Sequence, residues 1–411
     1  MKTIEGGITA AIGFLANGIA CGIKKRNKDL ALVVSEQPCT FAGAFTTNLV
    51  KAAPVLWDQD LVKNQETVRA ILINSGNANA CTGEQGSKDT KAMAAFAAQR
   101  LTEGQHPTTA EEVLVCSTGV IGLSLPMETI EKGIALITKN LKPSREAALD
   151  AALAICTTDT FTKEVAVEVM LGDKRVCIGG MAKGSGMIHP NMATMLSFIT
   201  TDATVSKKSL QALLGESVVD SYNMISVDGD TSTNDTVLVL ANGMSGSPLI
   251  DEANPYWDSF KEAFLFVHTA LAKAIVRDGE GAGKFIEVTV TGAVDKASAQ
   301  AIARSVVSSN LVKAAFFGSD ANWGRILCAM GYSGSSFDPD KVSLSFKSEK
   351  GSIDVLTGGQ PIAFDEKKAK SILLEREVEV HAKVGEGSGT GTAWGCDLSY
   401  EYVRINGDYR S

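Results

Sequence analysis

The chain has 411 residues, of which 45% are hydrophobic and 21% are charged, a composition typical of a folded globular protein rather than a disordered one. Its formal net charge of −8 disfavours binding to the phosphates of nucleic acids. No stretch approaches 18 consecutive apolar residues and no secretory signal is visible, so we expect a cytoplasmic protein with no membrane partner.

In chain order, hydrophobic periodicity predicts alternating strands and amphipathic helices, which is typical of an α/β (α+β) architecture. We expect a strand at 68–73, a helix at 89–101, a strand at 113–115, a helical stripe of Ile130, Ile134 and Ile137, strands at 165–170 and 195–199, a helix from its N-cap Ser206 to Val218, a strand at 237–240, a helix at 256–276, and strands at 285–290, 342–346 and 378–384. Polar glycine-rich segments lie between these elements, and such loops often approach ligands.

The cysteines and histidines show no metal-binding or redox spacing. The eight cysteines are scattered without a C-x-x-C pair, and the four histidines form no H-E-x-x-H motif. We therefore expect free thiols in a reducing compartment, and neither a metal nor a cofactor.

Two glycine-rich loops imitate nucleotide-binding motifs. Residues 385–391 carry Thr390 where a dinucleotide fingerprint needs its third glycine. Residues 281–284 resemble the end of a P-loop, but Asp278 and Phe285 stand where its first glycine and its metal-binding Ser or Thr belong. We give nucleotide binding by either loop little weight.

The loop at 183–194 is of a different kind, because it runs from glycine-rich polar sequence directly into the predicted strand at 195–199. A threonine at such a position suits an N-terminal nucleophile. Cleavage of the Ala193–Thr194 bond would release an α-amine. Such an amine has a pKa of about 8, so it can take the hydroxyl proton at neutral pH. The pattern alone still favours an ordinary threonine at a strand edge, since Thr is common in strands.

Segments along the whole chain resemble, in the same order, the ornithine acetyltransferase family, the glutamate N-acetyltransferases of arginine biosynthesis. They are 45–48, 52–55, 74–80, 117–122, 157–160, 183–188, 191–196, 226–235, 322–326, 392–398 and 405–411. The resemblance implies an α/β sandwich of the type shared with N-terminal-nucleophile-like aminopeptidases. It also implies self-cleavage at Ala193–Thr194.

The reaction implied by the resemblance is a ping-pong acetyl transfer. Thr194 would take the acetyl group from N2-acetyl-L-ornithine, release L-ornithine, and pass the acetyl group to L-glutamate, with its own amine as general base. Some family members also accept acetyl-CoA, so this second donor stays open, and with it an amino-acid N-acetyltransferase activity.

The resemblance also assigns roles to individual residues. Thr118 and Gly119 match the oxyanion hole. Substrate-binding positions match Thr157, Lys183, Thr194, Glu280, Asn406 and Ser411. Lys183 suits a substrate carboxylate and Glu280 an ornithine ammonium group. Family tails commonly end in Thr, whereas this chain ends in Ser411, which keeps the hydroxyl.

Cleavage would divide the chain into residues 1–193, with the oxyanion-hole and substrate loops, and residues 194–411, beginning with the nucleophile. The implied site draws on both segments, so we expect them to stay associated. The resemblance implies a heterotetramer of two α and two β chains.

Three alternatives remain at this point. An aminopeptidase or amidase of the same fold would use water as the acyl acceptor. A metabolite-binding protein would never cleave, and its affinity would be indifferent to Thr194→Ala. A nucleotide-dependent kinase would need phosphate binding by the glycine-rich loops at 281–284 or 385–391. The tail from Asn406 to Ser411, together with Lys183, favours the transferase.

Overall fold

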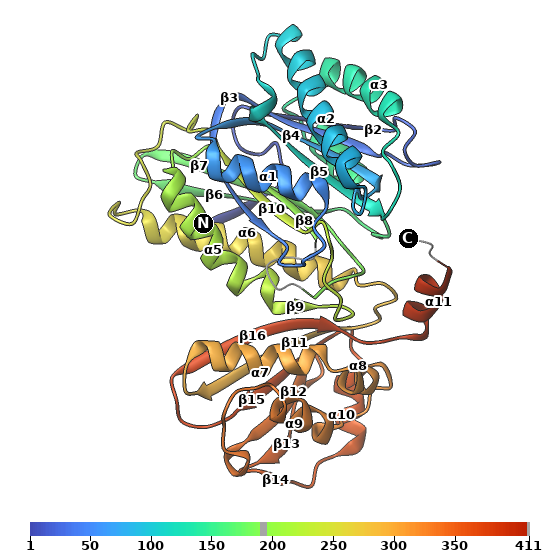
Figure 1. The fold of residues 1–411 in the computed structure, drawn as a ribbon. Helices are drawn as coiled ribbons and strands as arrows, with labels where there is room; N and C mark the ends of the chain where they lie inside the picture. Colours follow the sequence, from blue (N-terminus) through green and yellow to red (C-terminus); the bar gives the residue numbers. More distant parts are fainter. Residues whose placement is uncertain (190–194, 409–411) are drawn as a thin grey trace.

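The computed structural model describes residues 1–189 and 195–408, so Ala193, Thr194 and Ser411 lie outside the described residues. Its strands form a nine-stranded and a seven-stranded sheet, with helices packed against both (Figure 1). No helix within the described ranges is long and apolar enough to cross a membrane.

The strands are β1 (Lys2–Ile4), β2 (Phe14–Ile19), β3 (Leu30–Phe45), β4 (Val68–Asn77), β5 (Val113–Val120), β6 (Lys163–Leu171), β7 (Lys174–Lys183), β8 (Leu196–Thr201), β9 (Ile225–Ser226), β10 (Thr236–Ala241), β11 (Phe285–Ala293), β12 (Ser343–Ser348), β13 (Gly351–Thr357), β14 (Gln360–Pro361), β15 (Glu377–Lys383) and β16 (Gly389–Cys396). The helices are α1 (Ala53–Asn64), α2 (Gly83–Glu103), α3 (Met127–Ile137), α4 (Arg145–Ile155), α5 (Lys207–Asp220), α6 (Trp257–Arg277), α7 (Lys296–Ser308), α8 (Asn310–Phe317), α9 (Trp323–Gly331), α10 (Glu366–Leu373) and α11 (Tyr400–Asp408).

The long strand β3 divides the nine-stranded sheet into two halves. The strand order is β1-β6-β7-β8-β10-β3-β4-β5, and β2 also pairs with β3. A register shift between Val34 and Cys39 separates the part of β3 that pairs with β2 and most of β4 from the part that pairs with β10. Pro38 lies in this shift and has no N–H to donate to a ladder, which explains the interruption.

Successive side chains of a strand point to opposite faces of the sheet, and this alternation explains how the layers pack. Ile71 of β4 shares one core with Phe198 of β8 and Leu238 of β10, so the two halves of the sheet enclose a common core. The neighbouring Leu72 packs outward with α2 and α3, and Val239 packs outward with α5 and α6. This arrangement is the predicted α/β sandwich, which is confirmed.

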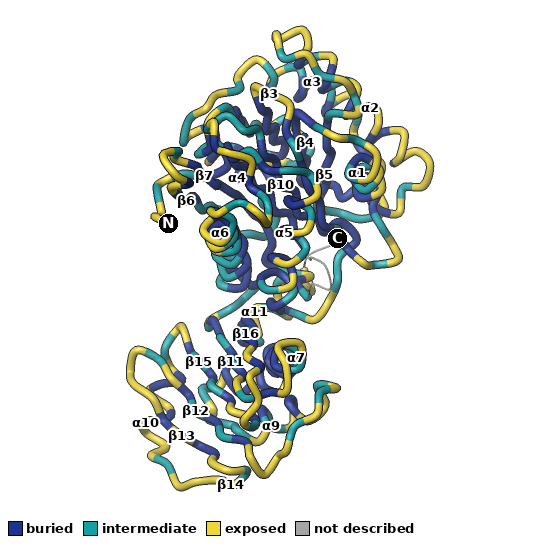
Figure 2. The backbone as a smooth tube through the Cα atoms, turned by 90° about the vertical axis from the view of Figure 1, so that its left-hand side faces the viewer, coloured by how far each residue is buried: buried dark blue, intermediate teal, exposed yellow. Residues whose placement is uncertain are grey.

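The seven-stranded sheet has the order β14-β13-β12-β15-β11-β16-β9. Its strand β9 comes from the chain between α5 and β10 and pairs with β16, so it links this sheet to the sandwich. Helix α7 packs against β16 and β11. Buried residues follow most strands of the nine-stranded sheet, whereas buried and exposed residues alternate along β13 and β15 at the outer side of the seven-stranded sheet (Figure 2).

Most predicted elements are confirmed, with shifts at their ends. Helix α2 begins at Gly83 rather than at the predicted residue 89, and Ser206 caps α5 by accepting a hydrogen bond from the Ser209 amide. The predicted strands coincide with β4, β5, β6, β8, β10, β11, β12 and β15. Strands, not helices, follow the glycine-rich loops at 281–284 and 385–391, so neither loop has the strand–loop–helix context of a nucleotide site.

The two predicted segments share one sheet. Strands β7 and β8 are antiparallel neighbours, with Lys183 paired to Leu196, and β8 pairs in parallel with β10. The division at 193/194 therefore runs through the nine-stranded sheet, and the second segment supplies two of its strands.

Candidate active site

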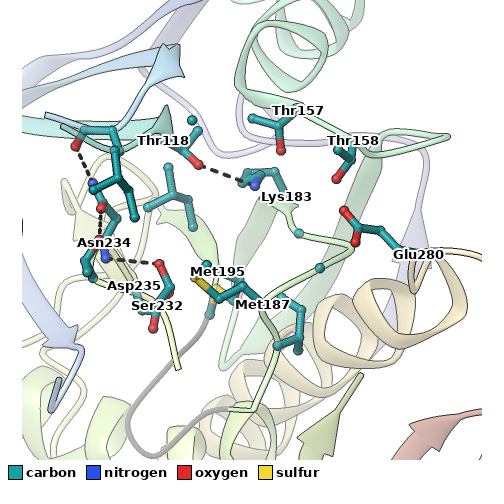
Figure 3. Close-up of a pocket in the computed structure, with 18 of the residues that line it drawn as sticks. Thr118, Thr157, Thr158, Lys183, Met187, Met195, Ser232, Asn234, Asp235 and Glu280 are labelled. Atoms are coloured by element: carbon teal, nitrogen blue, oxygen red, sulfur yellow. Dashed lines mark hydrogen bonds between the residues drawn. The ribbon is translucent and has the colours of Figure 1, made fainter. Parts of the chain in front are cut away.

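A cavity of about 230 Å³ opens where strand ends of the sandwich meet the loops after α4 and α6 (Figure 3). Its wall contains six of the predicted site residues: Thr118, Gly119, Thr157, Lys183, Glu280 and Asn406. Met195, which follows Thr194 in the sequence, also lines the cavity. The structure thus brings together the described predicted residues from both segments, while the predicted nucleophile and Ser411 fall outside the described residues.

The end of β5 forms one wall. Gly119 has φ +132°, and a Cβ atom there would lie 2.3 Å from the carbonyl carbon of Gly76 on the neighbouring strand. Only glycine fits this close approach. The adjacent Thr118 hydroxyl accepts a hydrogen bond of 3.4 Å from Lys183 Nζ. The Thr118 hydroxyl and the constrained strand backbone at Gly119 therefore line the cavity, and hydroxyl and backbone N–H groups can stabilise a developing oxyanion.

Lys183 is the last residue of β7 and is only 8% exposed. Among the described residues, no carboxylate lies within ion-pair distance of its Nζ. An ammonium group carries three donors, and among the described residues Lys183 makes one side-chain hydrogen bond, to Thr118. Lys183 is therefore suited to bind a ligand carboxylate inside the cavity.

The loop after α4 brings two hydroxyl groups to the cavity. Thr157 donates its backbone N–H to Asp159 Oδ2 at 2.9 Å. The hydroxyl of Thr158 lies 2.6 Å from that of Ser185, in the loop that follows β7. These contacts fix the loop against the start of the segment that leads to the predicted cleavage site.

Glu280 reaches the cavity from the loop after α6. Asn406 of α11 donates a hydrogen bond of 2.8 Å to Glu280 Oε2. The Glu280 amide donates to the Ser185 carbonyl oxygen at 2.8 Å. A Cβ atom on Gly186 would lie 2.3 Å from Glu280 Oε2, so the glycine makes room for this carboxylate. The arrangement presents a carboxylate that suits a ligand cation.

Sequence reasoning assigned no role to the polar residues before β10, yet four of them, Ser232, Thr233, Asn234 and Asp235, line the cavity. Asn234 Nδ2 donates to the carbonyl oxygens of Ala78 at 2.6 Å and Ser117 at 2.9 Å. The available signal was the position of this polar run, directly before a buried strand, like the segment before β8.

Asp235 is a buried acid in the same wall. It is 2% exposed, and among the described residues its Oδ2 has no hydrogen-bond partner. Burial raises the pKa of this carboxyl group well above its usual range, although hydrogen bonding from Ser232 and the charge of Lys183 oppose the shift.

The chain just before the predicted cleavage site is held by side chains of the second segment. Asp228 accepts hydrogen bonds from the amides of Met187 at 2.6 Å and Ile188 at 2.9 Å. His189 Nδ1 lies 3.1 Å from the Ser226 hydroxyl. Burial, reinforced by the charge of Arg304, lowers the pKa of His189 to about 4.

In the described part of the chain, no group of three or more His, Cys, Asp or Glu side chains is placed to hold a metal ion. All eight cysteines are free. The cavity instead offers a cation, carboxyl groups, hydroxyls and the constrained backbone at Gly119. This set suits a small amino-acid-like ligand whose carbonyl group is attacked.

Comparison with known proteins adds independent evidence. The model of the ArgJ family matches residues 15–411. The arginine biosynthesis bifunctional protein ArgJ of Caldanaerobacter subterraneus subsp. tengcongensis is 51% identical over 411 residues and covers 100% of both chains. Its counterpart in Thermotoga neapolitana is 53% identical over 401 residues, covering 97% of this chain and 99% of its own.

Solved structures are also similar. The crystal structure of ArgJ from Bacillus halodurans matches with a TM-score of 0.51 and 45% identity, over 53% of this chain and 100% of the solved chain. Ornithine acetyltransferase from Mycobacterium tuberculosis, complexed with ornithine, matches with a TM-score of 0.44 and 45% identity, over 46% of this chain and 97% of the solved chain.

Proposed function

Because this chain belongs to the ArgJ family, we propose that its cavity transfers an acetyl group from N2-acetyl-L-ornithine to L-glutamate. The chain is an acetyltransferase of arginine biosynthesis, as predicted from the sequence. This family membership favours the transferase over the aminopeptidase, metabolite-binding and kinase alternatives.

One observation carries the proposal. A single cavity gathers six predicted site residues from both segments, next to the residue that follows Thr194. Such convergence is not expected of surface-loop residues that merely happen to match a motif.

In the first half-reaction, the Thr194 hydroxyl attacks the acetyl carbonyl carbon and its own α-amine accepts the hydroxyl proton. Thr118 and Gly119 stabilise the negative charge that develops on the carbonyl oxygen. The intermediate collapses by breaking the amide C–N bond, and the proton passes to the departing ornithine nitrogen. In the second half-reaction, the α-amine of glutamate attacks the carbonyl carbon of the acetyl-Thr194 ester. The ester C–O bond breaks, the Thr194 α-amine passes the proton from the glutamate nitrogen to the Thr194 oxygen, and N-acetyl-L-glutamate leaves.

Substrate recognition follows from the charges of the cavity. Lys183 binds the α-carboxylate that both substrates carry. Glu280, held by Asn406, binds the side-chain ammonium of ornithine, and Thr157 and Ser411 supply further polar contacts. The ornithine complex of the Mycobacterium tuberculosis relative supports an ornithine-type ligand.

We infer that the active enzyme forms by self-cleavage. The Thr194 hydroxyl attacks the Ala193 carbonyl carbon, the peptide C–N bond breaks to free the α-amine, and water hydrolyses the resulting ester. The match to the Bacillus halodurans chain supports this, since it covers all of that chain with 53% of this one, and residues 194–411 are 218 of 411 residues, also 53%. The shared sheet would keep the pieces together, and two such pairs would form the heterotetramer.

The acetyl donor has a second candidate. The relatives are named bifunctional, which supports a proposal that acetyl-CoA also donates to Thr194. We propose no resident cofactor. Location in the cytoplasm likewise stays a proposal.

The proposed function is tested by supplying N-acetylornithine with and without glutamate. The pair should give ornithine and N-acetylglutamate in equal amounts, and N-acetylornithine alone should leave one acetyl group on the peptide that begins at Thr194. Release of free acetate at the same rate with and without glutamate would identify a hydrolase instead.

A further inference from the structure

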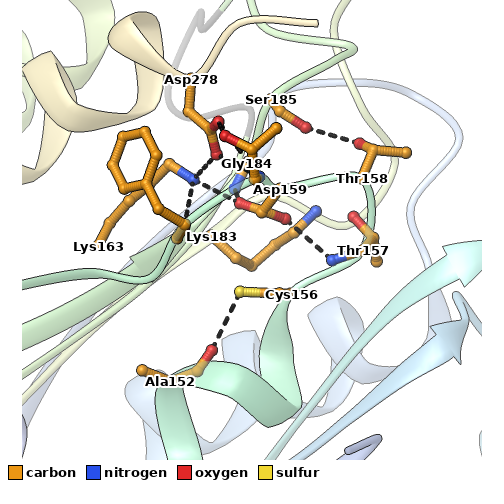
Figure 4. Close-up of polar contacts among 12 residues, drawn as sticks. Ala152, Cys156, Thr157, Thr158, Asp159, Lys163, Lys183, Gly184, Ser185 and Asp278 are labelled. Atoms are coloured by element: carbon orange, nitrogen blue, oxygen red, sulfur yellow. Dashed lines mark hydrogen bonds and ion pairs between the residues drawn. The ribbon is translucent and has the colours of Figure 1, made fainter. Parts of the chain in front are cut away.

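Three charged side chains form a buried network behind the cavity wall (Figure 4). Lys163 Nζ donates to Asp159 Oδ1 at 2.7 Å and to Asp278 Oδ2 at 2.5 Å. None of these side chains is more than 1% exposed, and none of them lines the cavity. The network therefore acts on the cavity only through the residues that it holds.

Asp159 holds two parts of the wall by their backbone. Its Oδ1 accepts a hydrogen bond of 2.7 Å from the amide of Gly184, and its Oδ2 accepts one of 2.9 Å from the amide of Thr157. Gly184 directly follows Lys183. One carboxylate thus sets the relative position of the Thr157 loop and the end of β7.

Asp278 extends the network to the second segment. It lies at the end of α6, two residues before Glu280, and accepts a hydrogen bond of 3.0 Å from the amide of Thr160. Because Lys163 binds both acids, the loop that carries Glu280 is joined to the loop that carries Thr157. These contacts join residues 1–193 to residues 194–411 independently of the Ala193–Thr194 peptide bond.

The charges of the network favour this geometry. Burial alone would raise the pKa of Asp159, but the charges of Lys183 and Lys163 and the Gly184 amide outweigh it and hold that pKa below its usual range. Asp159 therefore stays ionised and keeps its acceptor sites filled. A buried ion network is weak evidence for stability, since its desolvation cost offsets much of the attraction, so its position beside three wall segments is the more informative feature.

We propose that Asp159 is a positioning residue of the acetyltransferase: it aligns Thr157 and Lys183 through the backbone amides of Thr157 and Gly184, and aligns Glu280 through Lys163 and Asp278. The proposal rests on the proposed function for the identity of the substrate. It goes beyond that function in assigning a role to side chains that never touch the substrate.

The first test is Asp159→Asn. Its amide oxygen can still accept from Gly184 and Lys163, but its NH2 group would face the Thr157 N–H, so two donors would meet. We expect KM for N-acetylornithine to rise by about 10-fold, and up to about 100-fold if the wall shifts by about 1 Å, with a smaller change in kcat. Peptides that contain Thr157 and Gly184 should also exchange their amide hydrogens faster.

The matched control is Glu164→Gln. Glu164 is adjacent to Lys163 and its side chain is 5% exposed, but it pairs with Arg145 at 2.7 Å and lies outside the cavity wall. This variant should keep the wild-type KM and the wild-type exchange at Thr157 and Gly184. Equal losses in Glu164→Gln and Asp159→Asn would overturn the positioning role, and so would unchanged exchange in a folded Asp159→Asn protein.

If Asp159→Asn does not fold, Asp278→Asn provides the second test. It should raise KM and speed exchange in peptides that contain Thr160 and Glu280, and wild-type values for both would overturn the proposal. Failure of the proposed function is distinguishable, because it would leave the wild type and Glu164→Gln without acetyl transfer. The exchange comparison would then still decide whether Asp159 positions the wall.

Discussion

Asn234 donates a hydrogen bond of 2.9 Å from its side-chain amide to the carbonyl oxygen of Ser117, the residue immediately before Thr118. The same amide donates to the carbonyl oxygen of Ala78 at 2.6 Å. A side chain of the second segment therefore fixes the end of β5, the part of the first segment that carries the proposed oxyanion hole.

Asn234→Ala should lower kcat by about 10-fold or more, because loss of the donor leaves two carbonyl oxygens without this partner, at about 1–3 kcal/mol each, and loosens Thr118. The measurement is steady-state kinetics with N-acetylornithine and glutamate. Asn242→Ala is the matched control, since Asn242 follows the other end of β10 and donates to the Ile12 carbonyl oxygen at 2.8 Å. A kcat as low in Asn242→Ala as in Asn234→Ala would contradict the specific role.

Gly186→Ala should weaken binding of N-acetylornithine. Its new methyl group would lie 2.3 Å from Glu280 Oε2, so the carboxylate must move from the place where it meets the ornithine ammonium. We expect a higher KM. Gly215→Ala is the control: Gly215 lies inside α5 with nothing within 4 Å of the added atom, so this variant should gain about 0.5–1 kcal/mol in the free energy of unfolding with KM unchanged. An unchanged KM in Gly186→Ala would argue against Glu280 as the ammonium site.

His189 should make the stability of the protein depend on pH. Its pKa is lowered to about 4, below the usual value of 6.5, so the folded state favours the neutral ring. The stabilisation from His189 should be fully present above pH 6.5 and should be lost as the pH falls from 6.5 towards about 4. Urea unfolding in the uncut Thr194→Ala background should show that the advantage over His189→Asn shrinks between pH 7 and pH 5. A difference independent of pH would refute this assignment.

Local pattern predicted much of the fold, for reasons visible in particular strands. Residues 68–73 and 237–240 are short, mainly apolar runs, and both lie in buried strands. The division of the sheet at β3 could not be predicted in this way. It depends on pairing of residues 236–241 with residues about 200 positions earlier, and no local pattern encodes such a pairing.

The functional site, like the sheet, depends on contacts between distant parts of the chain that no local pattern predicts. Resemblance named Thr118, Lys183 and Asn406, but only the fold places them on one cavity. Asp159 lay within a matching motif and received no role, because its significance depends on Lys163 and on Asp278, which lies far along the chain. Contacts between buried side chains of distant elements are the part that sequence reasoning misses.

The proposed acetyl transfer requires Thr194 to become an N-terminal nucleophile, and the denatured mass of the purified protein shows whether it does. Division of 43.2 kDa in the ratio 193 to 218 gives fragments of about 20 and 23 kDa, the larger beginning at Thr194. Thr194→Ala should remain a single uncut chain without acetyl transfer, whereas Thr194→Ser keeps the hydroxyl and should still cleave. A single species of 43.2 kDa in a fully active wild-type preparation would contradict this role of Thr194.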